Sequence, residues 1–300
     1  MSQENLAGRN VAGYRLLHHV GEGGTAAVYR AEHLEKGVAA IKVLRARIGQ
    51  DPVAVKRFLR EAEYGSRVNH PNIVQTYAFG EEEGLYYLAL EWAEGEPLAT
   101  FATRSGQLAP ELVATIIEQL GAALSAAHHE GIIHRDLKPA NIMYTPANKL
   151  LKLLDFGIAR DSELVAEERL TRTGFFVGTL QYVAPEALSG ELVNEQADVY
   201  SLATITYYLL AGTLPYNGRS PRELFQQLLS QPPIPLNQAK KGLRFPQEVE
   251  DAVMKGLERD REKRSKTVDE FVAGVTTAIR SEGGKKGGGL LSGLFRRKPG

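Results

Sequence analysis

Three polar side chains between His134 and Gly157 constrain this chain more than any other feature. Asp136 and Asn141 stand five residues apart in a turn-rich segment, and Asp155 follows the short apolar run that comes next. Two carboxylates and one amide oxygen are hard oxygen ligands. They suit Mg²⁺, because this ion binds few carboxylates and leaves room for phosphate oxygens. The stretch therefore predicts a site at which a metal ion meets a phosphate group.

Two short motifs frame this stretch in a fixed order. Residues 134–141 read HRDLKPAN, and residues 155–157 read DFG. Either triplet alone, HRD or DFG, recurs by chance. Their combination is specific, because the two motifs occur in this order and Lys138 and Asn141 stand two and five residues after Asp136. The stretch resembles the catalytic core of the eukaryotic-type (Hanks-type) serine/threonine protein kinases.

The resemblance runs from Tyr14 to about Ile279 and implies the α+β, bilobal fold of that family. A small β-rich N-lobe with one main helix is expected over 14–90, a hinge over 91–95, and a larger, mostly helical C-lobe over 96–280. Residues 1–13 and 281–300 are then tails. A chain of 300 residues, 43% of them hydrophobic, is long enough and apolar enough for two such lobes.

A glycine-rich segment, GEGGTAAV at 21–28, follows a predicted strand that begins at Tyr14. The same glycine spacing marks dinucleotide-binding proteins, in which a helix must follow directly. Here a strand, a turn at 35–37 and a second strand over 38–44 follow instead. This arrangement favours a flap whose backbone N–H groups cover ATP phosphates. By resemblance, Gly21, Gly23 and Val28 belong to that flap, and Ala26 replaces the third glycine of the family.

Lys42 lies in an apolar strand, where an unpaired ammonium is costly to bury. It either reaches water from an edge strand or has an acidic partner. Asp51 and Pro52 predict the start of a helix, since they suit its cap and first turn. Phe58 and Ala62 mark the inward stripe of that helix, and Glu61 falls beside them. We expect Glu61 to pair with Lys42, and by resemblance this pair holds the α- and β-phosphates.

The resemblance also implies a nucleotide pocket between the lobes. Strands are expected over 73–79 and 85–92, leading into the hinge. Backbone groups of Glu91 and Ala93 would hydrogen-bond the adenine edge. The alternative for the apolar positions is an ordinary core role in a β-rich lobe. The residues expected to enclose the adenine ring are Val20, Val28, Ala40 and Met143.

Each polar residue of the central stretch receives a role from the same resemblance. Asp136 would accept or orient the hydroxyl proton of the substrate, and Lys138 would neutralise the γ-phosphate. Asn141 and Asp155 would hold Mg²⁺, with Mn²⁺ as an alternative ion. Lys138 and the pair Gly178-Thr179 are typical of the serine/threonine branch. The pattern is most similar to bacterial members such as the catalytic domain of the PASTA-type receptor kinases.

Residues 161–186 resemble an activation segment that closes in the motif A-P-E at 184–186. Thr171 and Thr173 lie where the family carries regulatory phosphates, and Arg135 would supply their charge partner. The alternative is that they are ordinary loop threonines. By the same resemblance, Arg264 would pair with a buried Glu186.

Two further patterns allow other interpretations. No charged residue occurs from Val199 to Gly218, which is long enough on paper to span a bilayer. Polar residues dilute the run, so a helix buried in the centre of the domain is favoured. His128 and His129 end an amphipathic helix that begins at Pro110. Adjacent helical residues point about 100° apart, which disfavours a shared metal.

Charge and composition narrow the expected partners. Residues 281–300 carry a net charge of +4, so residues 1–280 carry −4, and nucleic-acid binding is not expected. The glycine-rich segment from 281 onward is expected to be a disordered, solvated tail, or to make a weak contact with anionic lipid. The chain has no cysteine, which is compatible with the reducing cytoplasm. Residues 1–12 lack the apolar run of a signal peptide.

The sequence thus predicts transfer of the γ-phosphate from Mg²⁺-ATP to serine or threonine hydroxyls of proteins. Autophosphorylation of the activation segment would occur in trans within a homodimer. A nucleotide-binding pseudokinase is one alternative, but Lys42, Glu61, Asp136, Asn141 and Asp155 are all present. A small-molecule kinase on a related fold is another, and the A-P-E motif argues against it.

Overall fold

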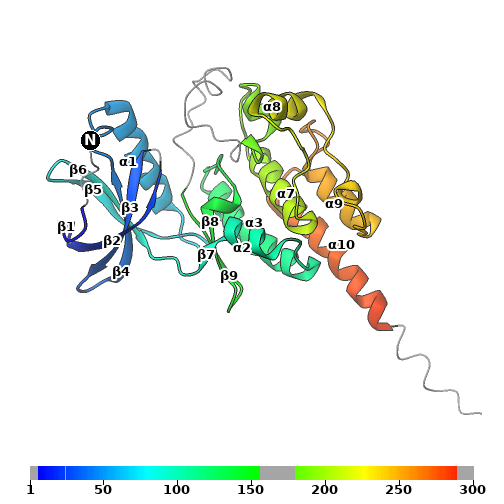
Figure 1. Ribbon diagram of the computed structural model, residues 1–300, viewed down its shortest axis with the longest axis horizontal. Helices are drawn as coiled ribbons and strands as arrows, with labels where there is room; N and C mark the ends of the chain where they lie inside the picture. Colours follow the sequence, from blue (N-terminus) through cyan, green and yellow to red (C-terminus); the bar gives the residue numbers. More distant parts are fainter. Residues whose placement is uncertain (1–5, 24, 156–179, 289–300) are drawn as a thin grey trace, which may run out of the picture.

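The computed structural model describes residues 6–23, 25–155 and 180–288, with side chains through Ser281. Figure 1 shows two lobes joined by a thin connection, as the α+β bilobal expectation requires. One lobe is built mainly from a sheet and the other mainly from helices.

The N-lobe is an antiparallel sheet with the strand order β1-β2-β3-β4-β6-β5. Strands β2 and β3 are consecutive and antiparallel, so the glycine-rich segment joins two strands and no helix follows it. This confirms the strand–loop–strand prediction. The strands are β1 (Asn10–Val11), β2 (Tyr14–Glu22), β3 (Ala26–His33), β4 (Gly37–Leu44), β5 (Thr76–Glu82) and β6 (Leu85–Glu91).

The predicted strand over 73–79 is wrong at its start, because β5 begins at Thr76. Ile73 instead forms an isolated parallel bridge with Leu153 of the C-lobe. The backbone of Val74 likewise donates to the Leu153 carbonyl at 3.0 Å. Apolar alternation continues through these residues, but their hydrogen-bonding partners lie in the other lobe.

Helix α1 (Pro52–Arg67) packs on the N-lobe sheet. The Asp51 side chain caps it by accepting from the Val53 N–H at 2.9 Å, as the Asp-Pro signal predicts. Phe58 and Ala62 are buried against Leu44 of β4, which fixes the face that the helix turns inward. Glu61, next to this stripe, therefore points toward the space between the lobes.

The C-lobe contains a small three-stranded sheet and a set of helices. Helix α7 lies at its centre, packed against α3, α9 and α10 (Figure 1). The strands are β7 (Glu96–Pro97), β8 (Ile142–Thr145) and β9 (Leu150–Leu153). The helices are α2 (Leu98–Ser105), α3 (Pro110–His129), α6 (Pro185–Leu188), α7 (Gln196–Ala211), α8 (Pro221–Ser230), α9 (Gln247–Gly256) and α10 (Val268–Gly288), with 3-10 turns η1 (Pro139–Asn141) and η2 (Leu236–Gln238).

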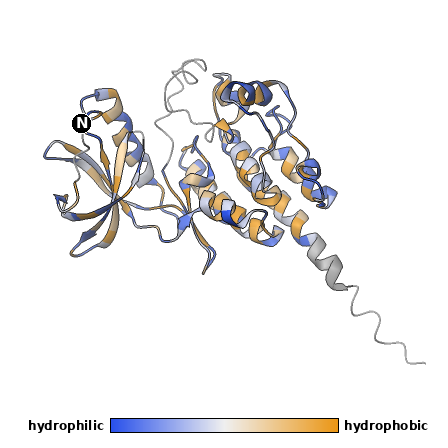
Figure 2. Cartoon of the chain, viewed as in Figure 1, coloured by the Kyte–Doolittle hydropathy of each residue, from blue (hydrophilic) through white to orange (hydrophobic). Residues whose placement is uncertain are grey.

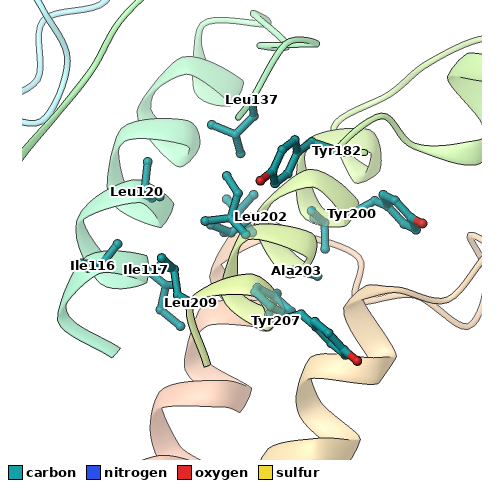
Figure 3. Close-up of a cluster of buried hydrophobic side chains, with 14 of the residues drawn as sticks. Ile116, Ile117, Leu120, Leu137, Tyr182, Tyr200, Leu202, Ala203, Tyr207 and Leu209 are labelled. Carbon is teal, nitrogen blue, oxygen red and sulfur yellow. The ribbon is translucent and has the colours of Figure 1, made fainter. Parts of the chain in front are cut away.

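Helix α7 accounts for the long uncharged run of the sequence. Nearly all of its residues are buried, and Figure 2 shows apolar residues concentrated along α7 and the adjoining part of α10. In Figure 3, Ile117 and Leu120 of α3 face Leu202 of α7. The hydroxyl groups of Thr204 and Thr206 donate to carbonyls one turn back, at 2.9 and 2.8 Å, so they are satisfied without water.

These contacts confirm the interpretation of the run as a buried central helix. The helix ends at Ala211, where Gly212 takes a left-handed conformation with φ +64°. Within residues 6–23, 25–155 and 180–288, no helix combines the length and the apolar character that crossing a membrane requires.

The predicted start of the C-terminal tail at residue 281 is wrong. Helix α10 continues to Gly288, so residues 281–288 are helical and not a disordered linker. Once a helix is nucleated, each further residue that is fixed adds one hydrogen bond, so the helix can run on into a glycine-containing segment. Residues 289–300 lie outside the described residues.

Candidate active site

The segment between α3 and β8 brings three of the predicted site residues together. The Lys138 ammonium lies 2.8 Å from Asp136 Oδ2. The Asn141 amide nitrogen donates to the Asp136 backbone carbonyl at 3.0 Å and to its carboxylate at 3.1 Å. One aspartate therefore holds the lysine and the asparagine at defined positions around its own carboxylate.

Asp198, in the first turn of α7, binds the backbone of the segment between α3 and β8. Its carboxylate is fully buried and accepts from the backbone N–H groups of His134 at 2.8 Å and Arg135 at 3.0 Å. Arg135 has φ +63°, a left-handed conformation that a non-glycine residue adopts only when its surroundings impose it. The two hydrogen bonds that His134 and Arg135 donate to Asp198 hold this conformation. They thereby fix the backbone that carries Asp136.

The charge of Asp198 is balanced inside the lobe. Burial raises the pKa of its carboxyl group, but the hydrogen bond with His128 and the electrostatic interactions with His134 and His128 outweigh this effect, so the pKa lies below its ordinary value. His128 Nε2 lies 2.8 Å from Asp198 Oδ2. His128 therefore has a structural role, as the partner of Asp198.

Asp198 is a functional residue that the sequence reasoning missed. Its signal was visible, since it is the last charged residue before the uncharged run of α7. An aspartate in the first turn of a helix is common, so the sequence indicates no special role for Asp198. Only the packing of α7 against the loop shows what Asp198 binds.

His134 connects this loop to the strand that carries Asp155. Its Nδ1 accepts from the Asp136 N–H at 3.3 Å, and its Nε2 donates to the Leu154 carbonyl at 3.2 Å. Complete burial lowers the pKa of His134, although the nearby aspartates oppose this. A neutral imidazole with one accepting and one donating nitrogen fits both contacts.

Asn141 and Asp155 lie at the same end of the β8–β9 hairpin. Ile142 pairs with Leu153 in its register, and the Leu154 N–H donates to the Asn141 carbonyl at 2.8 Å. Among the described residues, both hydrogen bonds of the Asn141 side-chain amide use its nitrogen, which leaves the amide oxygen as a ligand. An amide oxygen beside a carboxylate fits Mg²⁺ that also binds phosphate oxygens.

Lys42 joins the two lobes through two acidic partners. Its ammonium lies 2.7 Å from Glu61 Oε1 of α1 and 3.0 Å from Asp155 Oδ2 after β9. The expected Lys42–Glu61 pair is thus present. Strand β4 is flanked by β3 and β6, so the alternative of an edge-strand lysine reaching water does not hold.

Within this triad, Lys42 and Asp155 each stabilise the charged form of the other, whereas the carboxylates of Glu61 and Asp155 oppose each other. Burial lowers the pKa of Lys42, yet the charges of Asp155 and Glu61 outweigh it and raise the pKa well above its ordinary value. Burial raises the pKa of Asp155, and Lys42 outweighs that effect, so the pKa ends below its usual range. An ammonium and a carboxylate that both stay charged are the groups that a phosphate and a metal ion need.

Three of the residues expected at the nucleotide share one face of the N-lobe sheet. Val28 pairs with Lys42, and Ala40 pairs with Leu90, so Val28, Ala40 and Lys42 alternate onto the same side. Val20 lies in an irregular part of β2 and is 43% exposed. Met143, on β8, pairs with Pro97 directly after the hinge. Their contact with adenine stays a prediction.

The hinge is held from both lobes. Glu91 donates its N–H to the Gln75 carbonyl at 2.8 Å, and its carboxylate binds Lys152 of β9 at 2.6 Å. The Thr145 hydroxyl donates to the Glu94 carbonyl at 2.9 Å. The adenine contacts predicted for Glu91 and Ala93 remain untested, but the backbone that would make them is fixed in place.

Replacing Gly95 with alanine should destabilise the protein by at least about 2 kcal/mol. Gly95 has φ +104°, and an added Cβ would lie 2.3 Å from the Tyr144 carbonyl oxygen. Thermal unfolding measures the effect. Gly84→Ala is the matched control, since Gly84 has φ +78° but open space around it. An equal loss in both variants would show that the hinge contact is not the cause.

The remaining predicted site residues divide into two groups. Phe156, Gly157, Thr171 and Thr173 lie outside the described residues. The A-P-E motif begins α6, and Arg264 forms the expected bidentate pair with Glu186 at 2.7 and 3.0 Å, with both side chains buried.

Comparison with known proteins matches this geometry. Residues 14–275 match the family model described as the protein kinase domain. The chain is 35% identical over 282 residues to serine/threonine-protein kinase PrkC of Bacillus subtilis, covering 92% of this chain and 42% of that protein. It is 37% identical over 266 residues to PknB of Mycobacterium leprae, covering 87% of this chain and 42% of that protein. The chain thus spans about half the length of these curated relatives or less.

Solved structures agree with the fold. The PknI kinase domain of Mycobacterium tuberculosis superposes with a TM-score of 0.70 at 28% identity, covering 91% of this chain and 98% of that one. Rad53 in complex with AMP-PNP superposes with a TM-score of 0.72 at 28% identity, covering 89% of this chain and 65% of that one. With most of its length matched to the family model and a paired Lys42–Glu61–Asp155 triad at its centre, this chain belongs to the protein kinase domain family.

Proposed function

We propose that this protein is a serine/threonine protein kinase that transfers the γ-phosphate of ATP to hydroxyl groups of proteins in an Mg²⁺-dependent reaction. The observation that carries the proposal is the assembled set of charged groups: Lys42 bridges Glu61 and Asp155, and Asp136 holds Lys138 and Asn141. The printed names of the bacterial relatives support the serine/threonine class.

The residues of the site divide the work of phosphoryl transfer. Asp136 would orient the acceptor hydroxyl and take its proton, and Lys138 would balance the charge of the γ-phosphate. Lys42, fixed by Glu61, would hold the α- and β-phosphates beneath the glycine-rich loop. Asn141 and Asp155 would hold Mg²⁺, which when bound neutralises phosphate charge. The chain thus contributes positioning and charge complementarity, the main sources of catalysis in this reaction.

Two observations argue against the rival functions. A pseudokinase usually lacks one of the charged groups, whereas here every one is present and paired. A small-molecule kinase has no need of a substrate segment anchored in the C-lobe, and the buried Glu186–Arg264 pair anchors the A-P-E motif there.

Several finer points remain part of the proposal. Regulatory phosphates on Thr171 and Thr173 would bind Arg135, a half-buried residue whose buried Nε has no hydrogen-bond partner among the described residues. Trans-autophosphorylation in a homodimer, use of Mn²⁺, weak lipid contact by the C-terminal end and a cytoplasmic location are further predictions.

The direct test is incubation of the purified protein with labelled ATP and Mg²⁺, with and without a general protein substrate. Mass spectrometry then locates every phosphate. Phosphoserine or phosphothreonine on the chain or on the added protein is the expected result. The proposal fails if ATP binds but no hydroxyl is phosphorylated.

Asp155→Asn and Lys42→Met should lose activity in different ways. Raising Mg²⁺ or Mn²⁺ should partly restore the asparagine variant, because an amide oxygen still coordinates metal weakly. It should not restore Lys42→Met, which lacks a charge toward the phosphates. Metal titrations of initial rates distinguish the two. Equal rescue of both variants would contradict the assignment of Asp155 to metal and Lys42 to phosphate.

A further inference from the structure

Arg45 follows the last residue of β4 and contacts three residues of the glycine-rich loop. Its backbone N–H donates to the Thr25 carbonyl at 3.0 Å, which extends the β3–β4 pairing by one residue. Its guanidinium Nη2 donates to the Gly23 carbonyl at 3.0 Å and to Glu22 Oε2 at 3.0 Å. A single residue therefore binds the loop through both its backbone and its side chain.

The register of the sheet places this contact on the outer face, away from the cleft. Glu22 pairs with Ala27, and Ala27 pairs with Val43. Cross-strand partners share a face, and faces alternate along a strand. Glu22 and Val43 therefore lie on the face opposite Lys42. Arg45, two residues after Val43, reaches the loop from that outer face.

Arg45 neutralises the negative charge of Glu22, which would otherwise lie close to the nucleotide phosphates. Glu22 is an acidic residue at the end of β2, next to a loop that would cover a polyanionic triphosphate, where like charge opposes binding. The ion pair with Arg45 turns the carboxylate outward and neutralises it, while the Arg45 side chain itself is only 19% exposed. A loop proposed to cover phosphates then has no uncompensated carboxylate beside it.

Arg45 also connects the loop to helix α1. Its carbonyl accepts from the N–H groups of Ile48 at 2.8 Å and Gly49 at 2.9 Å. The Ile48 carbonyl in turn accepts from Asp51, the cap of α1. Because α1 carries Glu61, the partner of Lys42, a continuous hydrogen-bonded path joins the loop above the phosphates to the lysine that would bind them.

We propose that Arg45 is a positioning residue that holds the glycine-rich loop in place over the nucleotide phosphates, with Glu22 as its anionic partner. The inference rests on the proposed function, because the loop is assigned to ATP phosphates there. Arg45 touches neither the metal ligands nor Asp136, so its effect is on nucleotide binding and not on the transfer step.

The kinetic consequence follows from where the contact acts. A loosened loop weakens phosphate contacts in the ground state and the transition state alike, which raises KM and leaves kcat unchanged. Loss of one partly exposed charge-assisted contact is expected to raise KM for ATP about fivefold. In the absence of nucleotide, the backbone amides of residues 21–28 should exchange with solvent faster in a variant that lacks this contact than in the wild type.

The experiment compares four variants of the full chain with the wild type. Arg45→Met removes the charge and the donors, and Glu22→Gln removes only the acidic charge. The Arg45→Met/Glu22→Gln double variant tests whether the two act through one contact. Arg280→Gln is the control, because it breaks a bidentate ion pair with Glu118 far from the cleft. The readouts are KM for ATP, kcat, calorimetric ADP affinity and hydrogen exchange of residues 21–28.

Both single variants should raise KM and weaken ADP binding with kcat within about twofold of wild type, and the double variant should be no worse than Arg45→Met. The control should match the wild type. Unchanged exchange and ADP affinity in Glu22→Gln, whose side chain is 42% exposed, would overturn the proposal. The proposal would also be overturned if the effects of Arg45→Met and Glu22→Gln on KM and ADP affinity were additive in the double variant. A wild type that fails to bind ATP would instead refute the proposed function. The hydrogen-exchange data would then still test whether Arg45 and Glu22 hold the loop.

Discussion

Replacing Asp136 with asparagine is expected to lower kcat by about a hundredfold or more, the range for loss of a positioned acid–base group. Asparagine keeps the shape of the side chain and can still accept from the Asn141 amide. It removes the carboxylate that would take the hydroxyl proton, and it breaks the 2.8 Å ion pair with Lys138. KM for ATP should change little, because Asp136 faces the acceptor and not the nucleotide.

The measurement is steady-state phosphorylation of an added protein, with ATP affinity determined separately. Asp260→Asn is the matched control, since it makes the same chemical change at an exposed aspartate paired with Lys263. Unfolding temperatures of both variants should stay close to wild type. Near-normal turnover in a pure Asp136→Asn preparation would exclude the proton-accepting role.

Replacing Arg264 with methionine should destabilise the protein by about 3–5 kcal/mol, the cost of leaving a buried charge without its partner. The Arg264 side chain is fully buried and binds both oxygens of Glu186 and the carbonyls of Gln196 and Glu258. Its guanidinium also lies 5.1 Å from the centre of the Tyr200 ring. Methionine fills much of the volume and satisfies none of these acceptors.

Thermal unfolding should show a fall in Tm of the order of 10 °C. Arg280→Met is the control, because Arg280 makes an equally short pair with Glu118 at the surface. Exposed pairs contribute at most about 1 kcal/mol. Adding Glu186→Gln to Arg264→Met should recover part of the loss, since it removes the unpaired charge. A small change in Arg264→Met, similar to that of the control, would contradict a stabilising role for the pair.

Local chemistry was sufficient to predict the Lys42–Glu61 pair. An ammonium in an apolar strand needs an anion, and the stripe of α1 placed only Glu61 beside the inward residues Phe58 and Ala62. The strand–loop–strand arrangement at 21–28 was predictable for the same reason, because alternation, glycine and turn residues act within a few positions of one another.

Other features could be seen but not decided from the chain. The uncharged run from Val199 is long enough for a bilayer span, and its polar residues only favour a buried helix; the contacts of α7 with α3, α9 and α10 decide for the buried helix. Ile73 looks like a strand residue but bridges to Leu153 in the other lobe. Helix α10 continues eight residues past the predicted boundary at 280, since a glycine-rich composition does not by itself end an established helix.

The sequence by itself determined which side chains are candidates for the chemistry, because Asp136, Lys138, Asn141 and Asp155 stand at spacings set by one loop and one hairpin. Tertiary structure alone decided what holds them. Asp198 reaches His134 and Arg135 across more than 60 residues, and Arg45 reaches the glycine-rich loop across a strand. Such contacts depend on which elements pack together, and burial converts an ordinary surface residue type into a determinant of the site.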